Sequence, residues 1–325
     1  MILTCYYDLR YQPITFDFAI YLAGANAYAE EIKATKLAIK IILSESKAET
    51  ETERLYNEDE RAWRKYNILD RLPTFLSKTF SVAWSKEAPE LVDFPCYPPP
   101  IVEPNEKSLH YINYIEDFKK LNSEAISLNM FNTLKFIKTK FFKSPEVMKS
   151  FSAPAEALKL IEKKYGLKYI TISLRTSRFQ AARNSNIQSW KAACDYIFSK
   201  GLQPIIIPDF EDYFNNTQSF TEINYPVAFE AIFDVAFRMA LYQNAKHNLS
   251  VCKGANNNLL FFSKASYSIF KFVVPGVGNY TAQSQVKRNN LNYGEKFFFM
   301  DKNQYLLWTD DSKDFVMAHL KHLLE

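Results

Sequence analysis

Three arginines lie within nine residues of one another, directly after a short hydrophobic segment. They are Arg175, Arg178 and Arg183, and they follow the letters YITISL at 169–174. A guanidinium group presents a planar pair of donors that matches two phosphate oxygens. Asparagine and serine at 184–186 can cap a following helix, whose positive dipole end also favours an anion. Either this cluster binds phosphate or pyrophosphate, or its members are surface arginines paired with carboxylates.

Two further polar groups follow hydrophobic segments in the same half of the chain. Asp209 comes after the segment 204–207, and its carboxylate would accept hydrogen bonds from a nucleoside, cap its own loop or pair with Arg175. A lysine and three asparagines come after the segment 249–252: Lys253, Asn256, Asn257 and Asn258. Asparagine either caps a helix or occupies a left-handed turn, and its amide can also donate to phosphate.

Several common nucleotide and hydrolase motifs are absent from the sequence. It contains no GxGxxG, no GxxxxGK[ST] and no GxSxG, so the signature motifs of dinucleotide dehydrogenases, P-loop NTPases and α/β-hydrolases are absent. It has no Asp-x-Asp to hold a metal against a diphosphate, and its four cysteines form no CxxC. We therefore expect no metal site and no cofactor, with arginine, lysine and helix termini neutralising phosphate instead.

Composition is that of a soluble globular protein with about two domains. The chain has 325 residues, of which 47% are hydrophobic and 23% charged, and a net charge of +4, which gives no reason to expect a nucleic-acid partner. Glycine is scarce, with 7 residues, and aromatic residues are abundant, with 27 phenylalanines, 20 tyrosines and 4 tryptophans. No secretory signal and no apolar stretch of membrane-spanning length is present, so we expect a cytoplasmic protein with reduced cysteines.

Strand and helix patterns alternate along both halves of the chain. Strands expected at 1–10 and 37–43 flank a helix at 16–34, which is the β-α-β opening of a parallel sheet. The second half repeats this alternation, and its last helix, at 312–324, carries His319 and His322 as expected surface residues. We expect an α/β protein with two Rossmann-like domains facing across a cleft, joined near 145–165. In such sheets ligands gather at the carboxyl ends of the strands.

Two segments of the first half have open interpretations. The proline-rich segment 89–105 is either a buried extended link or a rigid surface crossing. Lysines alternate with phenylalanines in the segment 134–149, which is either a helix at an anionic membrane surface or a solvated helix whose phenylalanines join the core.

The polar segments of the second half together resemble a known family. TISLRTSRFQAARNSNIQSWKAACDYIFSKGLQPIIIPD, then KGANNNLLFFSKASYSIFKF, then NQYLLWTDD resemble the donor half of GT-B-type glycosyltransferases. The likeness is to bacterial surface-polysaccharide enzymes and, more distantly, to fucosyltransferases. Ser173 stands where the fucosyltransferase pattern has histidine, so the donor is left open.

The resemblance implies an N-terminal acceptor domain at 1–150 and a C-terminal nucleotide-sugar donor domain at 151–325. The three arginines would offset diphosphate charge, Lys253 and the asparagines at 256–258 would bind phosphate or sugar, and Asp209 would lie near the nucleoside. An inverting reaction needs a base, for which Asp17 is the candidate, its alternative being the N-cap of the first helix.

The implied function is metal-independent transfer of a sugar from a nucleotide-sugar to a glycan or lipid-linked acceptor in surface-polysaccharide synthesis. The nucleotide-sugar is a co-substrate, and the basic aromatic segment would suit peripheral contact with the inner membrane face. The alternative is a non-catalytic GT-B-like protein that binds nucleotide or glycan.

Overall fold

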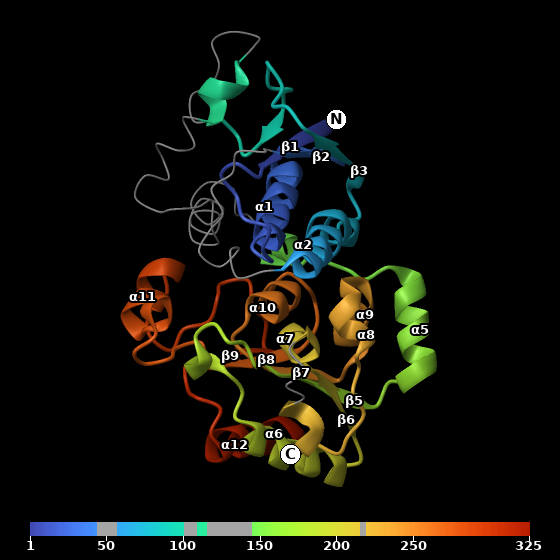
Figure 1. Cartoon of the computed structure of the whole chain (residues 1–325), viewed down its shortest axis with the longest axis vertical. Helices are drawn as coiled ribbons and strands as arrows, with labels where there is room; N and C mark the ends of the chain where they lie inside the picture. The colour runs from blue at the N-terminus through green and yellow to red at the C-terminus, as the bar shows by residue number, and fades with distance from the viewer. Residues whose placement is uncertain (44–56, 101–108, 116–144, 215–218) are drawn as a thin grey trace. The chain divides into compact units, whose positions relative to one another are not determined.

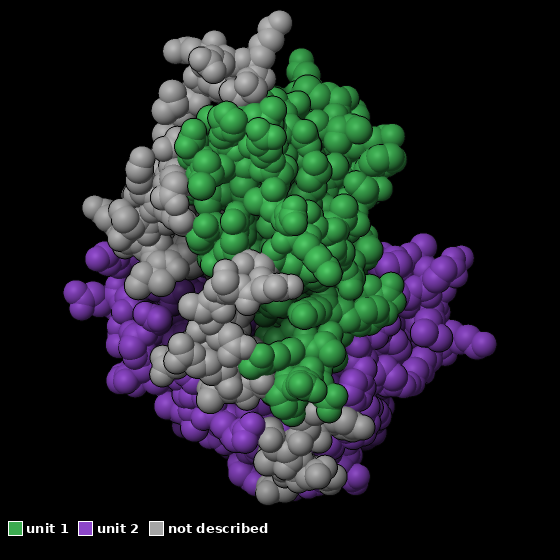
Figure 2. Space-filling view, turned by 45° about the horizontal axis from the view of Figure 1, so that its top comes forward, with its two compact units in different colours: residues 1–151 green, residues 152–325 purple. Residues whose placement is uncertain are grey.

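The chain folds as two compact α/β units, Met1–Phe151 and Ser152–Glu325 (Figure 1). The computed structural model describes residues 1–43, 57–100, 109–115, 145–214 and 219–325. Each unit contains one parallel sheet, as expected for Rossmann-like folds. Figure 2 shows the surface of each unit in its own colour. No helix in these ranges is both long and apolar enough to cross a membrane.

The sheet of the first unit has the order β3-β2-β1-β4. Its elements, in chain order, are β1 (Ile2–Asp8), α1 (Phe18–Glu31), β2 (Lys36–Ile42), α2 (Glu58–Arg64), a π-helical stretch (Lys65–Arg71), a 3-10 turn (Leu72–Phe75), β3 (Thr79–Ser85), β4 (Cys96–Tyr97) and a 3-10 turn (Pro145–Met148).

Successive residues of β1 point to opposite faces of this sheet, as the pleat requires. Tyr7 packs against Phe18 and Tyr21 of α1, with ring centroids 4.2 and 5.1 Å away. Tyr6 packs on the other side against Tyr111 and Tyr114, at 5.3 and 5.9 Å. Both faces of β1 are therefore covered by aromatic side chains, which accounts for part of the aromatic excess.

The sheet of the second unit has the order β6-β5-β7-β8-β9. Its strands are β5 (Tyr169–Ser173), β6 (Gln203–Ile207), β7 (His247–Val251), β8 (Tyr267–Phe270) and β9 (Gln304–Leu306). Its helices are α5 (Ala155–Tyr165), α6 (Ile187–Ser199), α7 (Phe210–Phe214), α8 (Glu230–Phe233), α9 (Val235–Asn244), α10 (Gly254–Phe261), α11 (Ala282–Asn289) and α12 (Lys313–Leu324).

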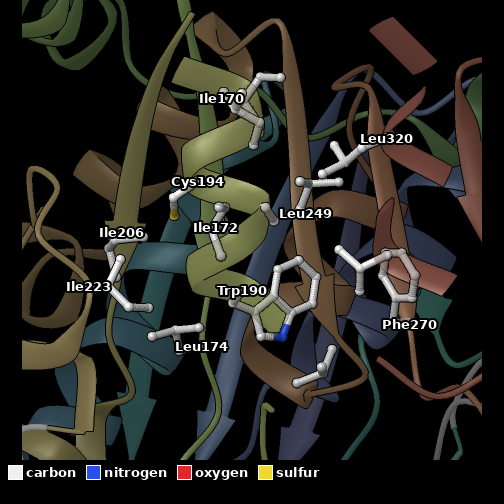
Figure 3. Close-up of a cluster of buried hydrophobic side chains, with 14 of the residues drawn as sticks. Ile170, Ile172, Leu174, Trp190, Cys194, Ile206, Ile223, Leu249, Phe270 and Leu320 are labelled. Atoms are coloured by element: carbon white, nitrogen blue, oxygen red, sulfur yellow. The ribbon is translucent and has the colours of Figure 1, made fainter. Parts of the chain in front are cut away.

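Alternation along β5 divides its side chains between two kinds of contact. Ile170, Ile172 and Leu174 join a fully buried cluster with Trp190 of α6 and Leu320 of α12 (Figure 3). On the opposite face, the hydroxyl of Tyr169 donates to the carbonyl of Leu241 in α9 at 2.8 Å, and Ser173 Oγ lies 2.9 Å from the Tyr242 hydroxyl. This strand is thus fixed from both faces, and the loop that follows it starts from a rigid base.

Several elements differ from the sequence-based expectation. The strand β9 and the helices α5, α7 and α11 are additional to the elements expected from the sequence. The proline-rich segment contains β4, which pairs with β1 and is flanked by two cis X-Pro bonds. Residues 134–144 lie outside the described ranges, and Lys149, at the end of the same segment, is buried.

His319 was expected on the surface but is partly buried, in a hydrogen-bonded chain that reaches the buried His247. Ser268 Oγ of β8 lies 2.7 Å from Nε2 of His319 and 2.7 Å from Nε2 of His247 in β7. Because the hydroxyl has one proton, one imidazole must donate to it while the other accepts. Burial and then the neighbouring His319 lower the pKa of His247 to about 3, while burial and His322 lower the pKa of His319 to about 4.

These lowered pKa values predict acid sensitivity. Between pH 6.5 and about 4, His247 and His319 bind protons in the unfolded chain but not in the folded chain. The free energy of unfolding therefore falls as pH drops. His247 contributes at most roughly 1.4 kcal/mol per pH unit. Urea unfolding at pH 7 and pH 5 should show a smaller pH difference for His247→Gln, whereas substitution of the exposed His322 by Gln should keep most of it. An unchanged difference in His247→Gln would contradict the assignment.

Candidate anion-binding site

The predicted polar residues meet where the strand order of the second sheet reverses. From β5 the chain crosses to β6 on one side and then to β7 on the other, which makes the carboxyl ends of these strands a topological switch point. Arg175 follows β5, Asp209 follows β6 and Lys253 follows β7. The parallel register places all three on one rim of the sheet.

Arg175 is buried, and its guanidinium is bound within its own loop. Nη1 donates to the carbonyl of Gln180 at 3.2 Å and to Oδ1 of Asn184, and Nη2 donates to the carbonyl of Phe179. These partners are all neutral. Burial, followed by the positive charge of Arg183, lowers the pKa of Arg175 to about 10. The structure therefore gives Arg175 a loop-organising role, with its charge incompletely compensated.

Arg183 is the second buried arginine of the loop, with 6% of its surface exposed. Nη1 donates to Oε1 of Gln180 and Nη2 to the carbonyl of Cys252, each at 2.9 Å. The Tyr280 ring lies against the guanidinium, with its centroid 3.5 Å from Cζ. Nε is buried and has no hydrogen-bond partner in the described chain. A buried charged donor without an acceptor is unfavourable, and a bound anion would remove that deficit.

A single strained residue connects the two arginines. Gln180 has φ of +53°, in the left-handed region that residues other than glycine rarely occupy. Its backbone carbonyl accepts from Arg175 and its side-chain oxygen accepts from Arg183. The loop thus holds both guanidinium groups close together, although they repel one another. Such strain is retained where the surrounding structure determines the conformation, commonly at functional sites.

Asp209 and Lys253 form an ion pair across the rim. Lys253 Nζ donates to Oδ1 of Asp209, while Oδ2 of Asp209 accepts from the backbone N–H of Thr176 at 3.0 Å. Burial alone would raise the pKa of Asp209, but the attraction of Lys253 and these hydrogen bonds outweigh it and lower that pKa. The pair was not among the alternatives considered for Asp209, whose role toward a nucleoside stays a prediction.

A second buried ion pair was missed by sequence reasoning. Lys271, which follows β8, lies 2.7 Å from Oδ1 of Asp311, and its Nζ also donates to the carbonyl of Asn184. Oδ2 of Asp311 accepts from the N–H of Asn186 at 2.7 Å and from Nε1 of Trp190 at 2.8 Å. These contacts fix the start of α6 beside the arginine loop. The sequence signal for this pair is Asp311, at the end of the letters WTDD. It points to this rim only when the preceding residues are recognised as the strand β9.

The third arginine differs from the other two. Arg178 is 73% exposed, its Nε lies 3.9 Å from Glu211 Oε2, and its backbone N–H donates to the same oxygen at 2.7 Å. It fits the alternative that sequence reasoning left open, a surface arginine paired with a carboxylate.

The start of α10 completes the rim. Lys253 is its N-cap residue and Gly254 its first residue, so the first N–H groups of the helix lie next to the buried cations. Asn257 accepts from the N–H of Lys253 at 3.2 Å and donates to the sulfur of Cys252, so its amide is used within the protein. Asn258 is buried. Asn256 lies in the same helix, and its side chain is outside the described part of the structure.

Asp17, the candidate base, lies in the first unit at the N-cap position of α1. Its carbonyl accepts from the N–H groups of Ile20 and Tyr21, at 3.0 and 3.3 Å. Its side chain makes no capping hydrogen bond to the helix. The carboxylate is partly exposed. A role in catalysis stays a prediction.

The arrangement is suited to binding an anion. The two lysines each have a carboxylate partner, whereas the hydrogen-bond partners of the two buried arginines within the described ranges are neutral. The Thr176 hydroxyl, next to Arg175, is also buried without a hydrogen-bond partner in the described ranges. In the same ranges no group of three or more His, Cys, Asp or Glu side chains could hold a metal ion. Excess positive charge beside a helix N-terminus favours phosphate or diphosphate.

Comparison with known proteins shows the fold. No protein-family model matches the sequence, and no curated protein matches it significantly. Among solved structures, the Escherichia coli ADP-heptose lipopolysaccharide heptosyltransferase II matches with a TM-score of 0.51 and 7% identity, covering 100% of this chain and 98% of that one. A glycosyl transferase family 9 protein of Veillonella parvula DSM 2008 matches with a TM-score of 0.46 and 10% identity, covering 99% and 97%.

The chain therefore has the α/β fold with two parallel sheets found in GT-B glycosyltransferases, as the resemblance implied. Identity of this order shows the fold and no more. Neither of the two structures is a fucosyltransferase, so that part of the resemblance stays a prediction.

Removing the unpartnered hydroxyl should separate binding from stability. Thr176→Val deletes a hydroxyl with no hydrogen-bond partner among the described residues, so the free energy of unfolding without ligand should stay the same or rise. If the hydroxyl serves an anion, the Kd for a nucleoside diphosphate should rise roughly 10- to 100-fold. Calorimetry on both proteins measures this. Ser150→Ala deletes a hydroxyl of the first unit that likewise has no partner in the described part of the chain, and it should leave that Kd unchanged. If Thr176→Val binds with the same Kd as the wild type, Thr176 does not contribute to anion binding.

Proposed function

We propose that the chain is a glycosyltransferase that moves a sugar from a nucleotide-sugar to a glycan or lipid-linked acceptor without a metal ion. The second unit would hold the donor and the first unit the acceptor. Surface-polysaccharide synthesis at the inner membrane face is the proposed setting. A fold does not determine a function, so the proposal depends on the rim of the second sheet.

The observation that carries the proposal is the pair of buried guanidinium groups at the switch point. A departing nucleoside diphosphate gains negative charge as its bond to the sugar breaks, and preorganised cations stabilise that charge most where water is excluded. Arg183 has an unused buried donor for this purpose, and α10 adds its first N–H groups. The E. coli neighbour is described as an enzyme of ADP-heptose, a donor with this type of leaving group.

The proposed step is direct displacement at the anomeric carbon. The acceptor hydroxyl oxygen forms the new glycosidic bond while the bond from that carbon to the diphosphate oxygen breaks. The electron pair leaves with the diphosphate, and the carboxylate of Asp17 takes the proton of the hydroxyl. Arg183, with Arg175 holding the loop, stabilises the leaving group.

A non-catalytic nucleotide-binding protein is the second candidate, and one observation favours it. Asp209, Lys253 and Asn257 each have their described hydrogen bonds within the protein. A donor site would need some of these groups to exchange partners when the ligand binds. If they do not, the rim can bind a phosphate without positioning a sugar.

Nucleotide binding is measured by thermal unfolding. ADP, UDP, GDP and CMP should be compared, and at ten times its Kd the preferred nucleotide stabilises by roughly 1.4 kcal/mol, about 3 to 6 °C in Tm. Arg183→Gln should reduce this shift by more than half, whereas Arg178→Gln, at the exposed arginine of the same loop, should retain it. No shift with any nucleotide at millimolar concentration would contradict both candidate functions.

Catalysis is measured separately, by hydrolysis of ADP-, UDP-, GDP- and CMP-sugars with water as acceptor. Loss of a general base reduces turnover about 10²- to 10⁴-fold, so Asp17→Asn should do so without changing nucleotide affinity. Asp59→Asn, at an exposed aspartate in the first turn of α2, is the matched control. Nucleotide binding by the wild type without turnover of any donor would favour the non-catalytic candidate.

A further inference from the structure

A separate pocket of about 300 Å³ lies entirely within the first unit. It is bounded by the turn that follows β1 and by two segments, around residues 88–90 and 110–115, and this volume is at the lower end for small-molecule pockets. The residues that define its chemistry are Arg10, Tyr11, Glu90, His110, Tyr111 and Ile112.

The two outer segments are tied together by backbone pairing. Leu91 and His110 form an antiparallel bridge, with the N–H of Val92 donating to the carbonyl of Leu109 at 2.9 Å. The N–H of Tyr111 donates to the carbonyl of Glu90, also at 2.9 Å. The pocket wall is therefore held by main-chain hydrogen bonds, which fix the backbones of Glu90 and Tyr111 relative to each other.

A buried carboxylate positions the arginine of the pocket. Asp8, which is 1% exposed, accepts from Arg10 Nε at 3.0 Å and from Nη2 at 2.6 Å, and its Oδ2 also accepts from the Tyr111 hydroxyl at 3.1 Å. These contacts to Asp8 raise the pKa of Arg10 above its usual value. Among described residues, Nη1 of Arg10 has no hydrogen-bond partner, so a fixed guanidinium retains free donors.

The other walls of the pocket are apolar. The Cζ of Arg10 lies 5.3 Å from the ring centroid of Tyr11 and 6.0 Å from that of Tyr111. Beneath Tyr111 is a buried cluster that includes Tyr6 and Tyr114. Tyr11 and Ile112 are 38% and 71% exposed, and thus offer apolar surface to a ligand.

The charges of the pocket select against an ionic ligand. Arg10 is already neutralised by Asp8, and Glu90 would repel an anion. A cation on either tyrosine ring would lie beside the guanidinium of Arg10, whose Cζ is 5.3 and 6.0 Å from the two ring centroids, and would be repelled by it. A neutral ring with many hydroxyls has neither penalty: its C–H face can pack on an aromatic ring, while carboxylate, imidazole and guanidinium groups bond its hydroxyls.

From this chemistry we propose that the pocket binds a neutral sugar ring, stacked on Tyr11 and hydrogen-bonded by Glu90 and Arg10. Under the proposed function this sugar is part of the acceptor, and only that identification rests on the glycosyltransferase proposal. Binding itself depends on the first unit alone.

The experiment is saturation-transfer NMR on the full chain with methyl glycosides of glucose, galactose and mannose. A ligand of this size should bind with a Kd on the order of 1–10 mM. Methyl glucuronoside and methyl glucosaminide test an anionic and a cationic ring of the same shape. Tyr11→Ala and Glu90→Gln should each raise the Kd by at least about 5-fold, a loss near 1 kcal/mol.

The matched control is Tyr66→Ala. Tyr66 is a 47% exposed tyrosine of the same unit with Arg71 Cζ 5.1 Å from its ring centroid, but it lies outside the pocket. This variant should bind the glycosides as the wild type does. Stronger binding of either charged glycoside, equal binding by Tyr11→Ala, or no saturation by any neutral glycoside at about 50 mM would overturn the proposal.

The same samples distinguish failure of this proposal from failure of the proposed function. Glycoside binding without a nucleotide-induced shift in Tm would support the sugar-binding pocket and contradict the proposed glycosyltransferase function. A nucleotide-induced shift in Tm without glycoside binding would contradict only the proposal that the pocket binds a sugar.

Discussion

Two guanidinium groups, Arg175 and Arg183, are buried in one loop where their hydrogen-bond partners among the described residues are neutral, and the rim of the second sheet is organised around them. Desolvation and mutual repulsion both act against their charges, which is why the pKa of Arg175 falls to about 10. Their carbonyl, amide and aromatic partners offset part of that cost. A bound anion would offset the rest and would therefore stabilise the second unit.

The rest of the second unit supplies the rigidity that this arrangement needs. Packing of β5 from both faces anchors the loop, and the buried pair of Lys271 with Asp311 joins that loop to α6. Two residues of the rim, Gln180 and Lys271, have positive φ although neither is glycine. Glycine in these positions would relieve strain but remove the side chains that hold Arg183 and Asp311. At these two positions the rim therefore keeps a functional side chain where glycine would be less strained.

Sequence patterns were sufficient for the fold class and for the elements that carry the site. Apolar runs bounded by turn residues marked β5, β6 and β7, and the rule that ligands gather at carboxyl ends of parallel strands singled out Arg175, Arg183, Asp209 and Lys253. Short elements such as β9 and the two-residue strand β4 were missed, because three or fewer residues carry no usable period.

Pairing between side chains was the part that sequence could not provide. The partners of Asp209, Lys253 and Asp311 come from segments tens of residues away, and only the strand order brings them together. The same limit applies to the pocket of the first unit, where Asp8 and Tyr111 are far apart along the chain. Arg178 and Arg183 could not be told apart by type, since one is exposed and the other buried within the same short loop.

The most direct measurement is a crystal structure of the full chain with its preferred nucleoside diphosphate. We predict a phosphate oxygen within about 3.2 Å of Arg183 Nε, with further oxygens at the first N–H groups of α10. A diphosphate bound elsewhere, with Arg183 Nε still lacking an acceptor, would contradict the assignment of this rim as the nucleotide site.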